Sequence, residues 1–153
     1  MDAMPQPTVT IRTAGIADLP LVIPLLALLD GPGTTPLERD EAANLLARMA
    51  SYPDYRLFIA VANGQAVGIY TLLIMDNLGH HGSPIGIVEC VSVAEFHRGQ
   101  GIGKQLMLHA MGECRTKGCY KLALSSNVAR SDAHAFYDSL GFKRHGFSFV
   151  VEL

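Results

Sequence analysis

The sequence predicts a mixed α/β domain, because segments that alternate like strands are interleaved with segments that have the 3.6-residue period of helices. Two local patterns are strongest: a strand–Asn–Gly–strand hairpin, and a strand that passes through a glycine-rich loop into a helix. The chain has 153 residues, 49% of them hydrophobic, which favours one domain around a single core. We therefore expect residues 1–153 to form one domain with a central mixed sheet flanked by helices.

The expected elements follow one another without a linker or a repeat. Asp18 is expected to cap the first helix, Ser131 to cap the last one, and Gly118 to end the helix before it. The apolar run "IGIVECVSV" predicts a strand that is buried on both faces. Strands are expected at 8–14, 55–62, 65–75, 85–93, 120–126 and 147–153, and helices at 19–29, 37–51, 101–117 and 131–140.

Composition argues against several classes of protein. A net charge of -2 gives no electrostatic reason to expect nucleic acid as a partner, and no run rich in lysine or arginine suggests a membrane surface. Cys90, Cys114 and Cys119 are odd in number and form no CxxC pair, which favours free thiols in a reducing compartment. The first ten residues, "MDAMPQPTVT", lack a basic patch followed by an apolar core, so we expect a cytoplasmic protein without membrane attachment.

The glycine-rich loop, "HRGQGIGKQL", lies between an expected strand and an expected helix. Glycine lets the backbone approach a ligand, and a helix N-terminus offers unpaired N–H groups to an anion such as phosphate. A dinucleotide fingerprint would need glycine where Lys104 stands, and a P-loop would need glycine at Arg98 and serine or threonine at Gln105. The remaining pattern is R-x-x-G-x-G. Its structural alternative is a tight turn with a solvated arginine.

Two segments in this order, "VECVSVAEFHRGQGIGKQL" and "LSSNVARSDAHAFYDSLGF", resemble the GNAT superfamily of N-acetyltransferases. In that family R/Q-x-x-G-x-G/A holds the pyrophosphate of acetyl-CoA. The resemblance covers roughly residues 85–142. It implies the GNAT acyl-CoA N-acyltransferase fold, acetyl-CoA as cosubstrate, no metal, and direct transfer of the acetyl group to a primary amine.

The resemblance also assigns residues to the cosubstrate and to proton transfer. Tyr137 matches the tyrosine that protonates the departing thiolate; its alternative is ring packing. Asn127 matches a cosubstrate contact, with a turn or cap residue as its alternative. The backbone N–H of Val91 is expected to polarise the thioester carbonyl. The cosubstrate is expected to contact Val91, Val93, Arg98, Gly99, Gln100, Gly101, Ile102, Gly103, Lys104 and Asn127.

Glu89 is the candidate general base, because it is the one charged residue in an otherwise apolar strand. Burial raises the pKa of a carboxylate and so makes it a stronger base. The alternatives are that Glu89 has only a structural role, or that water alone accepts the proton. A covalent route through Cys90 is set aside, since buried cysteine usually fills space. His80 and His81 lack the further ligands a metal site needs, so they are expected to be solvated loop residues or to contact substrate.

The function predicted by these residues is an N-acetyltransferase whose acceptor is a small-molecule, peptide or protein amine. The alternative is a non-catalytic acyl-CoA-binding or regulatory module on the same fold. The apolar end "FSFVVEL" is expected to form an edge strand that favours a homodimer. Four phenylalanines are expected in the core: Phe136, Phe142, Phe147 and Phe149.

Overall fold

The computed structural model describes residues 8–153, which fall into two compact units that divide after Ala123. The first unit contains a sheet and three α-helices, and the second contains one α-helix. Most of the segment used to argue against a leader, residues 1–7, lies outside the described residues. That residues 1–153 form a single domain stays a prediction.

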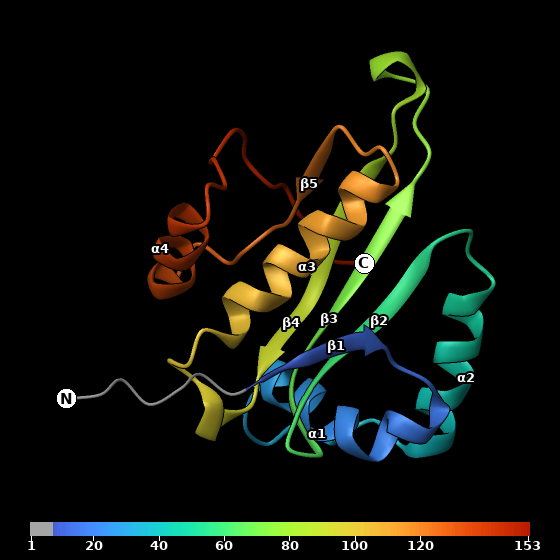
Figure 1. Ribbon diagram of the computed structural model, residues 1–153, viewed down its shortest axis with the longest axis vertical. Coiled ribbons are helices and arrows are strands. Elements are labelled where there is room, and N and C mark those ends of the chain that lie inside the picture. Colours follow the sequence, from blue (N-terminus) through green and yellow to red (C-terminus); the bar gives the residue numbers. More distant parts are fainter. Residues whose placement is uncertain (1–7) are drawn as a thin grey trace. The chain divides into compact units, whose positions relative to one another are not determined.

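The first unit is built on a five-stranded sheet whose strand order follows the chain (Figure 1). Its strands are β1 (Thr10–Thr13), β2 (Tyr55–Ala62), β3 (Gln65–Met75), β4 (Ile85–Val93) and β5 (Lys121–Ala123). Neighbouring strands are antiparallel from β1 to β4, and β5 runs parallel to β4. Asn63 and Gly64, which join β2 to β3, have φ values of 51° and 73°, as a two-residue hairpin turn requires. The predicted mixed sheet is confirmed.

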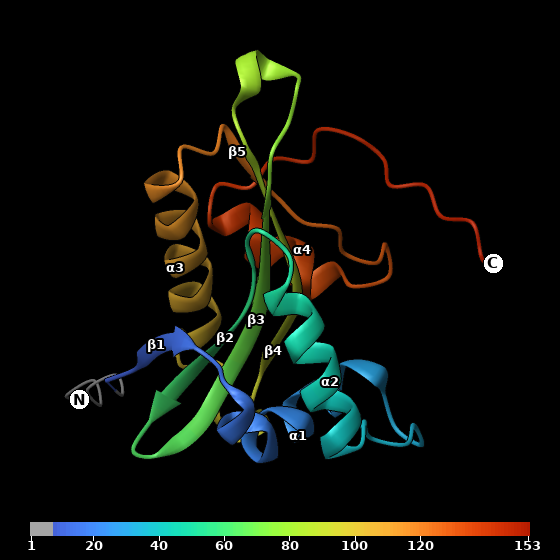
Figure 2. The ribbon, with the colours of Figure 1, turned by 90° about the vertical axis from the view of Figure 1, so that its right-hand side faces the viewer.

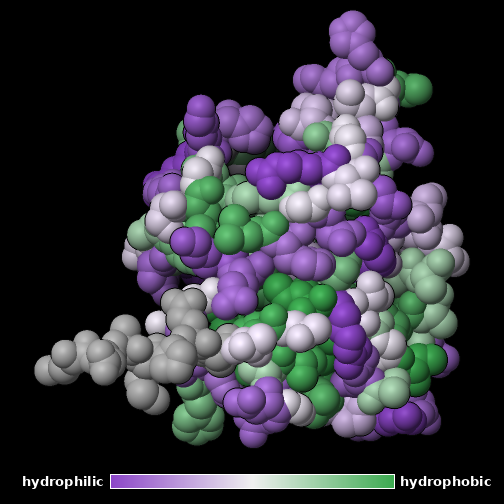
Figure 3. Space-filling model, in the orientation of Figure 1, coloured by the Kyte–Doolittle hydropathy of each residue, from purple (hydrophilic) through white to green (hydrophobic). Residues whose placement is uncertain are grey.

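Three helices cover the two faces of this sheet. Helix α3 (Ile102–Thr116) packs on one face, and α1 (Leu19–Asp30) and α2 (Arg39–Ala50) lie on the other (Figure 2). Ile102, Leu106 and Met107 bury the apolar side of α3, and a core cluster that includes Val22 and Ile69 fills the side of α1. Apolar patches on the outer surface alternate with polar side chains in Figure 3. Among residues 8–153, no helix combines the length and the apolar character needed to cross a membrane.

The turn from β1 into α1 differs from the sequence prediction at Asp18. This residue ends a short 3-10 helix (Ile16–Asp18), and its side chain does not cap α1. Its carboxylate instead accepts two hydrogen bonds from the Arg12 guanidinium, at 2.8 and 2.7 Å, and one from the Gly15 backbone N–H at 2.8 Å. The prediction of a cap is wrong because the cation on β1 and the N–H before the helix compete for the same oxygens.

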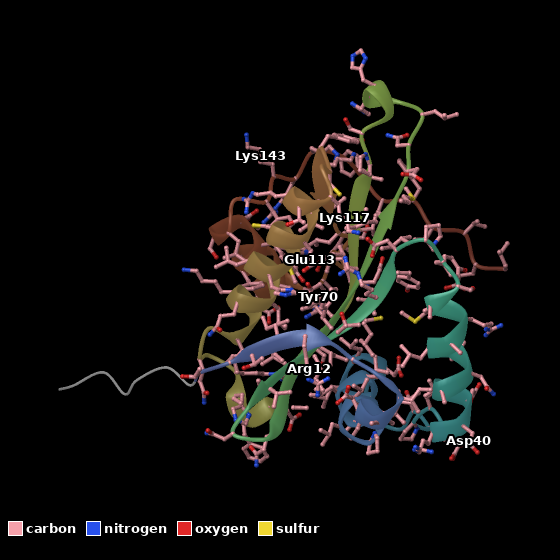
Figure 4. All side chains as sticks on the ribbon, turned by 45° about the vertical axis from the view of Figure 1, so that its right-hand side comes forward. Arg12, Asp40, Tyr70, Glu113, Lys117 and Lys143 are labelled. Carbon is pink, nitrogen blue, oxygen red and sulfur yellow. The ribbon has the colours of Figure 1, made fainter. Side chains whose placement is uncertain are left out.

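A polar network lies between the sheet and the C-terminal half of α3. The hydroxyl of fully buried Tyr70 lies 2.7 Å from Nδ1 of His109. One turn further along α3, Glu113 accepts a hydrogen bond from Arg56 at 2.7 Å, and Arg56 also donates to Asp54 at 2.7 Å. Figure 4 shows Tyr70 and Glu113 on this side of the sheet. Desolvation lowers the pKa of His109, with Glu113 opposing and Arg56 adding to the shift, so the imidazole is held neutral.

The second unit contains α4 (Ser131–Ser139), and its caps also differ from the prediction. Ser131 is the first helical residue and makes no capping hydrogen bond. Asn127 organises the preceding turn: its side-chain oxygen accepts from the Ala129 N–H at 2.9 Å, and its carbonyl accepts from the Arg130 N–H at 3.0 Å. A turn stabilised by an asparagine side chain therefore precedes the helix, as in an Asx-turn.

The predicted strand at 147–153 is wrong, and the predicted strand at 120–126 is reduced to Lys121–Ala123. A strand needs a partner for its backbone N–H and C=O groups, and the structure assigns none to residues 143–153. Phe147 and Phe149 are each 92% exposed, so their assignment to the core is also wrong. Phe136 and Phe142 are half-buried and each lies beside the ring of Tyr137.

The Arg12–Asp18 pair predicts a loss of stability in acid. Hydrogen bonds from Arg12 and Gly15 lower the pKa of Asp18 from 3.8 to about 2, so the unfolded chain takes up this proton first as the pH falls. Stabilisation by the pair should be complete above about pH 4 and be lost between about pH 4 and pH 2. Asp18→Asn should lower the free energy of unfolding at pH 7 by about 1–3 kcal/mol and flatten the profile in this window.

Urea unfolding at pH 7 and pH 3 measures both effects. Asp40→Asn is the matched control, because the Asp40 side chain is 98% exposed on α2 (Figure 4) and should change neither value. An Asp18→Asn variant with the wild-type stability at pH 7 would show that the pair contributes nothing.

Candidate active site

Strand β4 supplies most of the predicted site, and it is interrupted by a β-bulge. Thr71 pairs with Glu89 and Ile69 pairs with Ser92, so two residues of β4, Cys90 and Val91, stand opposite one residue of β3. Cys90 has a φ of 53°, which is uncommon for a residue with a side chain. Such a bulge bends the strand and redirects its backbone groups. The predicted site residues Glu89 and Val91 lie on either side of this distortion.

The other edge of β4 is paired with a strand only at its start. Strand β5 pairs with Ile85–Ile87 only, so among residues 8–123 no strand accompanies β4 from Val88 to Val93 on that side. Backbone groups that make no ladder hydrogen bonds are available to an extended ligand, which would add to the strand as a neighbouring strand does. The geometry suits the predicted contacts of Val91 and Val93.

The glycine-rich loop follows directly at the end of β4. Gly99 and Gly101 have φ values of 76° and 78°, a backbone conformation that strains residues with side chains. Gly101 is the N-cap of α3, and no side chain caps this end of the helix. The first N–H groups of α3 are therefore left for an external acceptor. An ideal Cβ on Gly99 would meet no atom within 4 Å, so its surface side is open.

The polar groups around this loop fit an anionic ligand. Arg98 and Lys104 are exposed at its two ends, and the Arg98 side chain donates from Nε to the Val93 carbonyl at 3.4 Å. Nδ1 of His97 is buried and has no hydrogen-bond partner. The two cations Arg98 and Lys104, the N-terminus of α3 and the unsatisfied Nδ1 of His97 together make a site suited to phosphate groups. Ile102 differs from the other predicted contacts, because its side chain is 1% exposed and belongs to the core.

Glu89 is exposed, so the expectation that it is buried in a strand covered on both faces is wrong. The bulge and the missing β5 partner uncover this part of β4. The thiol of neighbouring Cys90 has a raised pKa, because of desolvation first and then the negative charges of Glu89 and Asp30. The hydroxyl of Thr71 opposes this rise, although its Oγ1 makes no hydrogen bond of acceptable geometry. The Cys90 sulfur is thus kept as a neutral thiol. Cys90 is exposed, so the expectation that it is buried, on which the covalent route was set aside, is wrong.

Ser92 is a buried polar residue of the site that the sequence did not single out. Its hydroxyl donates to the carbonyl of Leu25 in α1 at 2.8 Å, and the residue is only 5% exposed. This bond fixes α1 against β4 beside the bulge. A serine in an otherwise apolar strand could have suggested a buried hydrogen bond. Its partner, the Leu25 carbonyl, lies 67 positions away in the chain, so the sequence did not identify it.

Two predicted site residues belong to the second unit. Tyr137 lies in α4, and desolvation raises the pKa of its hydroxyl, with Arg130 opposing the shift. The phenol therefore stays protonated at neutral pH, as a proton donor must. Asn127 stabilises the turn before α4, which is the structural alternative considered for it. The structure thus brings Glu89, Val91, Val93 and the loop residues together in the first unit, and Asn127 and Tyr137 together in the second.

His80 and a separate cavity lie apart from these residues. His80 stacks on Tyr120 with ring centroids 4.1 Å apart, and residues 8–153 contain no cluster of three metal-ligating side chains. A cavity of about 550 Å³ lies among β1, α2 and the start of β2, and reaches Lys117 just after α3. Since the 15-residue α3 is about 22 Å long, this cavity is remote from the glycine-rich loop at the other end.

Residues 25–142 match the model of the Acetyltransferase (GNAT) family. The chain is 38% identical over 112 residues to the aminoalkylphosphonate N-acetyltransferase of Salmonella typhimurium, covering 73% of this chain and 69% of that protein. It is 34% identical over 112 residues to the glucosamine 6-phosphate N-acetyltransferase of Trypanosoma brucei brucei, covering 72% and 74%. A solved structure of a putative acetyltransferase from Agrobacterium tumefaciens str. C58 has a TM-score of 0.88 at 33% identity, covering 94% of this chain and 99% of that one.

The loop geometry predicts that Gly103→Val weakens acetyl-CoA binding by at least about tenfold, because a branched side chain would occupy the space in front of the first helical N–H groups. Gly112→Val is the matched control in the same helix, where an ideal Cβ meets no atom within 4 Å. Titration calorimetry gives the affinity, and thermal unfolding shows whether both variants stay folded. Unchanged affinity in a folded Gly103→Val variant would remove the loop from the binding site.

Proposed function

Because the chain belongs to the GNAT family of N-acetyltransferases, we propose that it moves the acetyl group of acetyl-CoA directly to a primary amine, with Glu89 as general base and Tyr137 as general acid. The resemblance inferred from the two sequence segments is confirmed by the family match and by the relatives. The observation that carries the proposal is the geometry of strand β4. This strand contains a bulge, pairs with β5 over Ile85–Ile87 only, and leads into a glycine-rich loop at the N-terminus of α3, which no side chain caps.

The family uses acetyl-CoA as its cosubstrate, and the residues around β4 fit its polar parts. Arg98, Lys104 and the N–H groups at the start of α3 would hold the pyrophosphate. The backbone of Val91 and the N–H of Val93 would hold the pantetheine arm, and the Val91 N–H would polarise the carbonyl. Gly99, Gln100, Gly101, Ile102 and Gly103 contribute backbone to the loop, and Asn127 remains a proposed contact from the second unit.

The proposed reaction requires proton transfers from the acceptor nitrogen and to the departing thiolate. An alkyl ammonium has a pKa near ~10.4, so at neutral pH it must lose a proton before its nitrogen can attack. Glu89, directly or through water, takes that proton; the N–C bond then forms as the C–S bond breaks. Tyr137 gives its proton to the departing thiolate, and the second proton that the attacking nitrogen loses as the amide forms returns to the Tyr137 phenolate, so that charges and atoms balance. The exposed position of Glu89 gives water and acceptor access to its carboxylate.

The acceptor is proposed to be an amine of a small molecule or of a protein. The two relatives described above are named for small phosphorus-containing amines, and an N-alpha-acetyltransferase of Schizosaccharomyces pombe is 26% identical over 95 residues. Oligomerisation is a further proposal. Phe147, Phe149 and Val150 are more than four-fifths exposed, and burial of this apolar end against a second copy would favour a homodimer.

Thiol release from acetyl-CoA in the presence of a broad panel of amines tests the proposed function. The expected result is amine-dependent release together with acetylated product in the mass spectrum. Specific binding of acetyl-CoA without turnover of any amine would instead favour the non-catalytic alternative.

The acid–base roles predict different pH dependences for two variants. Glu89→Gln should lose most activity at low pH, where few amines are already neutral, and should recover partly as the pH rises. Tyr137→Phe should lower kcat by at least about 10²-fold with little change in acetyl-CoA affinity. Steady-state kinetics over a pH series measures both.

Two exposed residues give matched controls for this series. Glu95→Gln removes a carboxylate near the glycine-rich loop, and Tyr120→Phe removes a phenol that stacks on His80. Neither should change the pH profile. A Glu89→Gln variant with wild-type rates at every pH would assign the base to water or to another group. Wild-type kcat in Tyr137→Phe, with chemistry rate-limiting, would leave Tyr137 only a packing role.

A further inference from the structure

Helix α3 ends in a turn that brings two cysteines together. The N–H of Cys119 donates to the carbonyl of Cys114 at 2.9 Å, and the N–H of Gly118 donates to the carbonyl of Arg115 at 3.1 Å. Gly118 has a φ of 73°. These two bonds around a glycine with positive φ define a Schellman motif, in which the side chains of the two outer residues frequently touch. In this motif both outer side chains are thiols.

The backbone hydrogen bond also limits the separation of the two cysteines. The 2.9 Å between Cys119 N and Cys114 O, together with the covalent bonds that lead to the two Cα atoms, leaves these Cα atoms no more than about 7 Å apart. Disulfides usually join residues whose Cα atoms are about 4.4–6.8 Å apart. The turn therefore brings Cys114 and Cys119 within the range in which a cross-link can form.

The two thiols differ in their exposure to solvent. Cys114 is 4% exposed, and its sulfur fills the space that a Cβ on Gly86 of β4 would need, whereas Cys119 is partly exposed. Figure 4 marks this end of α3 with Glu113 and Lys117. Burial raises the pKa of the Cys114 thiol, and the neighbouring Cys119 raises it further. Cys119 is therefore the thiol that a reagent from solvent reaches first.

We propose that Cys114 and Cys119 are a modification site, which a low-molecular-weight disulfide converts reversibly into an internal disulfide bond between the end of α3 and the segment that leads into β5. The inference is independent of the proposed acetyl transfer. The Cys119 thiolate attacks one sulfur of the reagent and displaces one small thiol. Cys114 then attacks the Cys119 sulfur and displaces the second. The protein gives up two protons and two electrons, and the reagent is reduced to two thiols.

The cross-link would act at the end of the sheet where β4 and β5 are paired. The Tyr120 N–H donates to the Pro84 carbonyl at 3.1 Å, and Lys121 pairs with Ile85. The bond would fasten this corner and leave the edge of β4 from Val88 onward unchanged. Since a cross-link also restricts the unfolded chain, we expect the oxidised protein to be the more stable form.

Peptide mapping tests whether the cross-link forms. Arg115 and Lys117 lie between the two cysteines, so trypsin leaves the cysteines on separate peptides, 105–115 and 118–121. Reduced protein is incubated with oxidised glutathione, the remaining thiols are alkylated, and the protein is digested without reduction. The joined peptides should exceed glutathione-modified 118–121 by at least about tenfold, because the second thiol is held beside the first. Treatment with dithiothreitol should separate them again.

Two variants and a second measurement make the test specific. Cys119→Ser should abolish the joined peptides. Cys90→Ser is the matched control, because it removes the exposed thiol of β4 and should preserve them. In thermal unfolding, oxidation should raise Tm by about 4–8 °C in the wild type and in Cys90→Ser, and not in Cys119→Ser.

Three results would overturn the inference. Absence of the joined peptides, whether Cys119 carries glutathione or both thiols stay free, would show that the two sulfurs do not meet. Joined peptides found only in covalent dimers would show a bond between two copies. Joined peptides with an unchanged or lower Tm would show that the bond strains the turn and does not fasten it.

Discussion

The bulge at Cys90 is the constraint on which the rest of the candidate site depends. A continuous β4 would place Val91 in an antiparallel ladder with β3, and its N–H would be committed to that strand. The positive φ at Cys90 costs about 1–3 kcal/mol for a residue with a side chain, so surrounding contacts must hold it. The buried bond from Ser92 to Leu25 and the ordinary pairing of Thr71 with Glu89 supply such contacts on both sides.

Strand β3 presents a different environment on each of its faces at this point. Tyr70 points toward α3, where its hydroxyl is paired with His109 and the network continues to Glu113 and Arg56. Thr71 points toward the opposite face, where its buried hydroxyl lies beside the thiol of Cys90. The satisfied network stabilises the contact between α3 and the sheet, because a buried polar group without a partner would cost about 1–3 kcal/mol. Tyr70 therefore belongs to a closed polar network on one face of the sheet, whereas Thr71 lies beside the bulge on the other face.

Local sequence patterns predicted the parts of the fold that local interactions determine. Asn63–Gly64 correctly marked the hairpin, and the R-x-x-G-x-G pattern correctly placed a loop at the start of α3. Features that depend on distant partners were missed. The bulge follows from the register of β4 on β3, Asp18 pairs with Arg12 on another element, and the end of the chain found no neighbouring strand. The alternating pattern of "FSFVVEL" favours an extended strand, but it does not show whether a partner strand lies beside it.

Charge is a second property whose local distribution cannot be read from the composition of the whole chain. The net charge of -2 conceals a loop with two cations, Arg98 and Lys104, that follows a strand whose one charged residue is Glu89. Glu89 and the bulge beside it are not part of the glycine-rich motif that identifies the family. The glycine-rich motif therefore relates to the cosubstrate that the family shares, whereas the surroundings of Glu89 depend on the register of β4 on β3, which no local sequence pattern specifies.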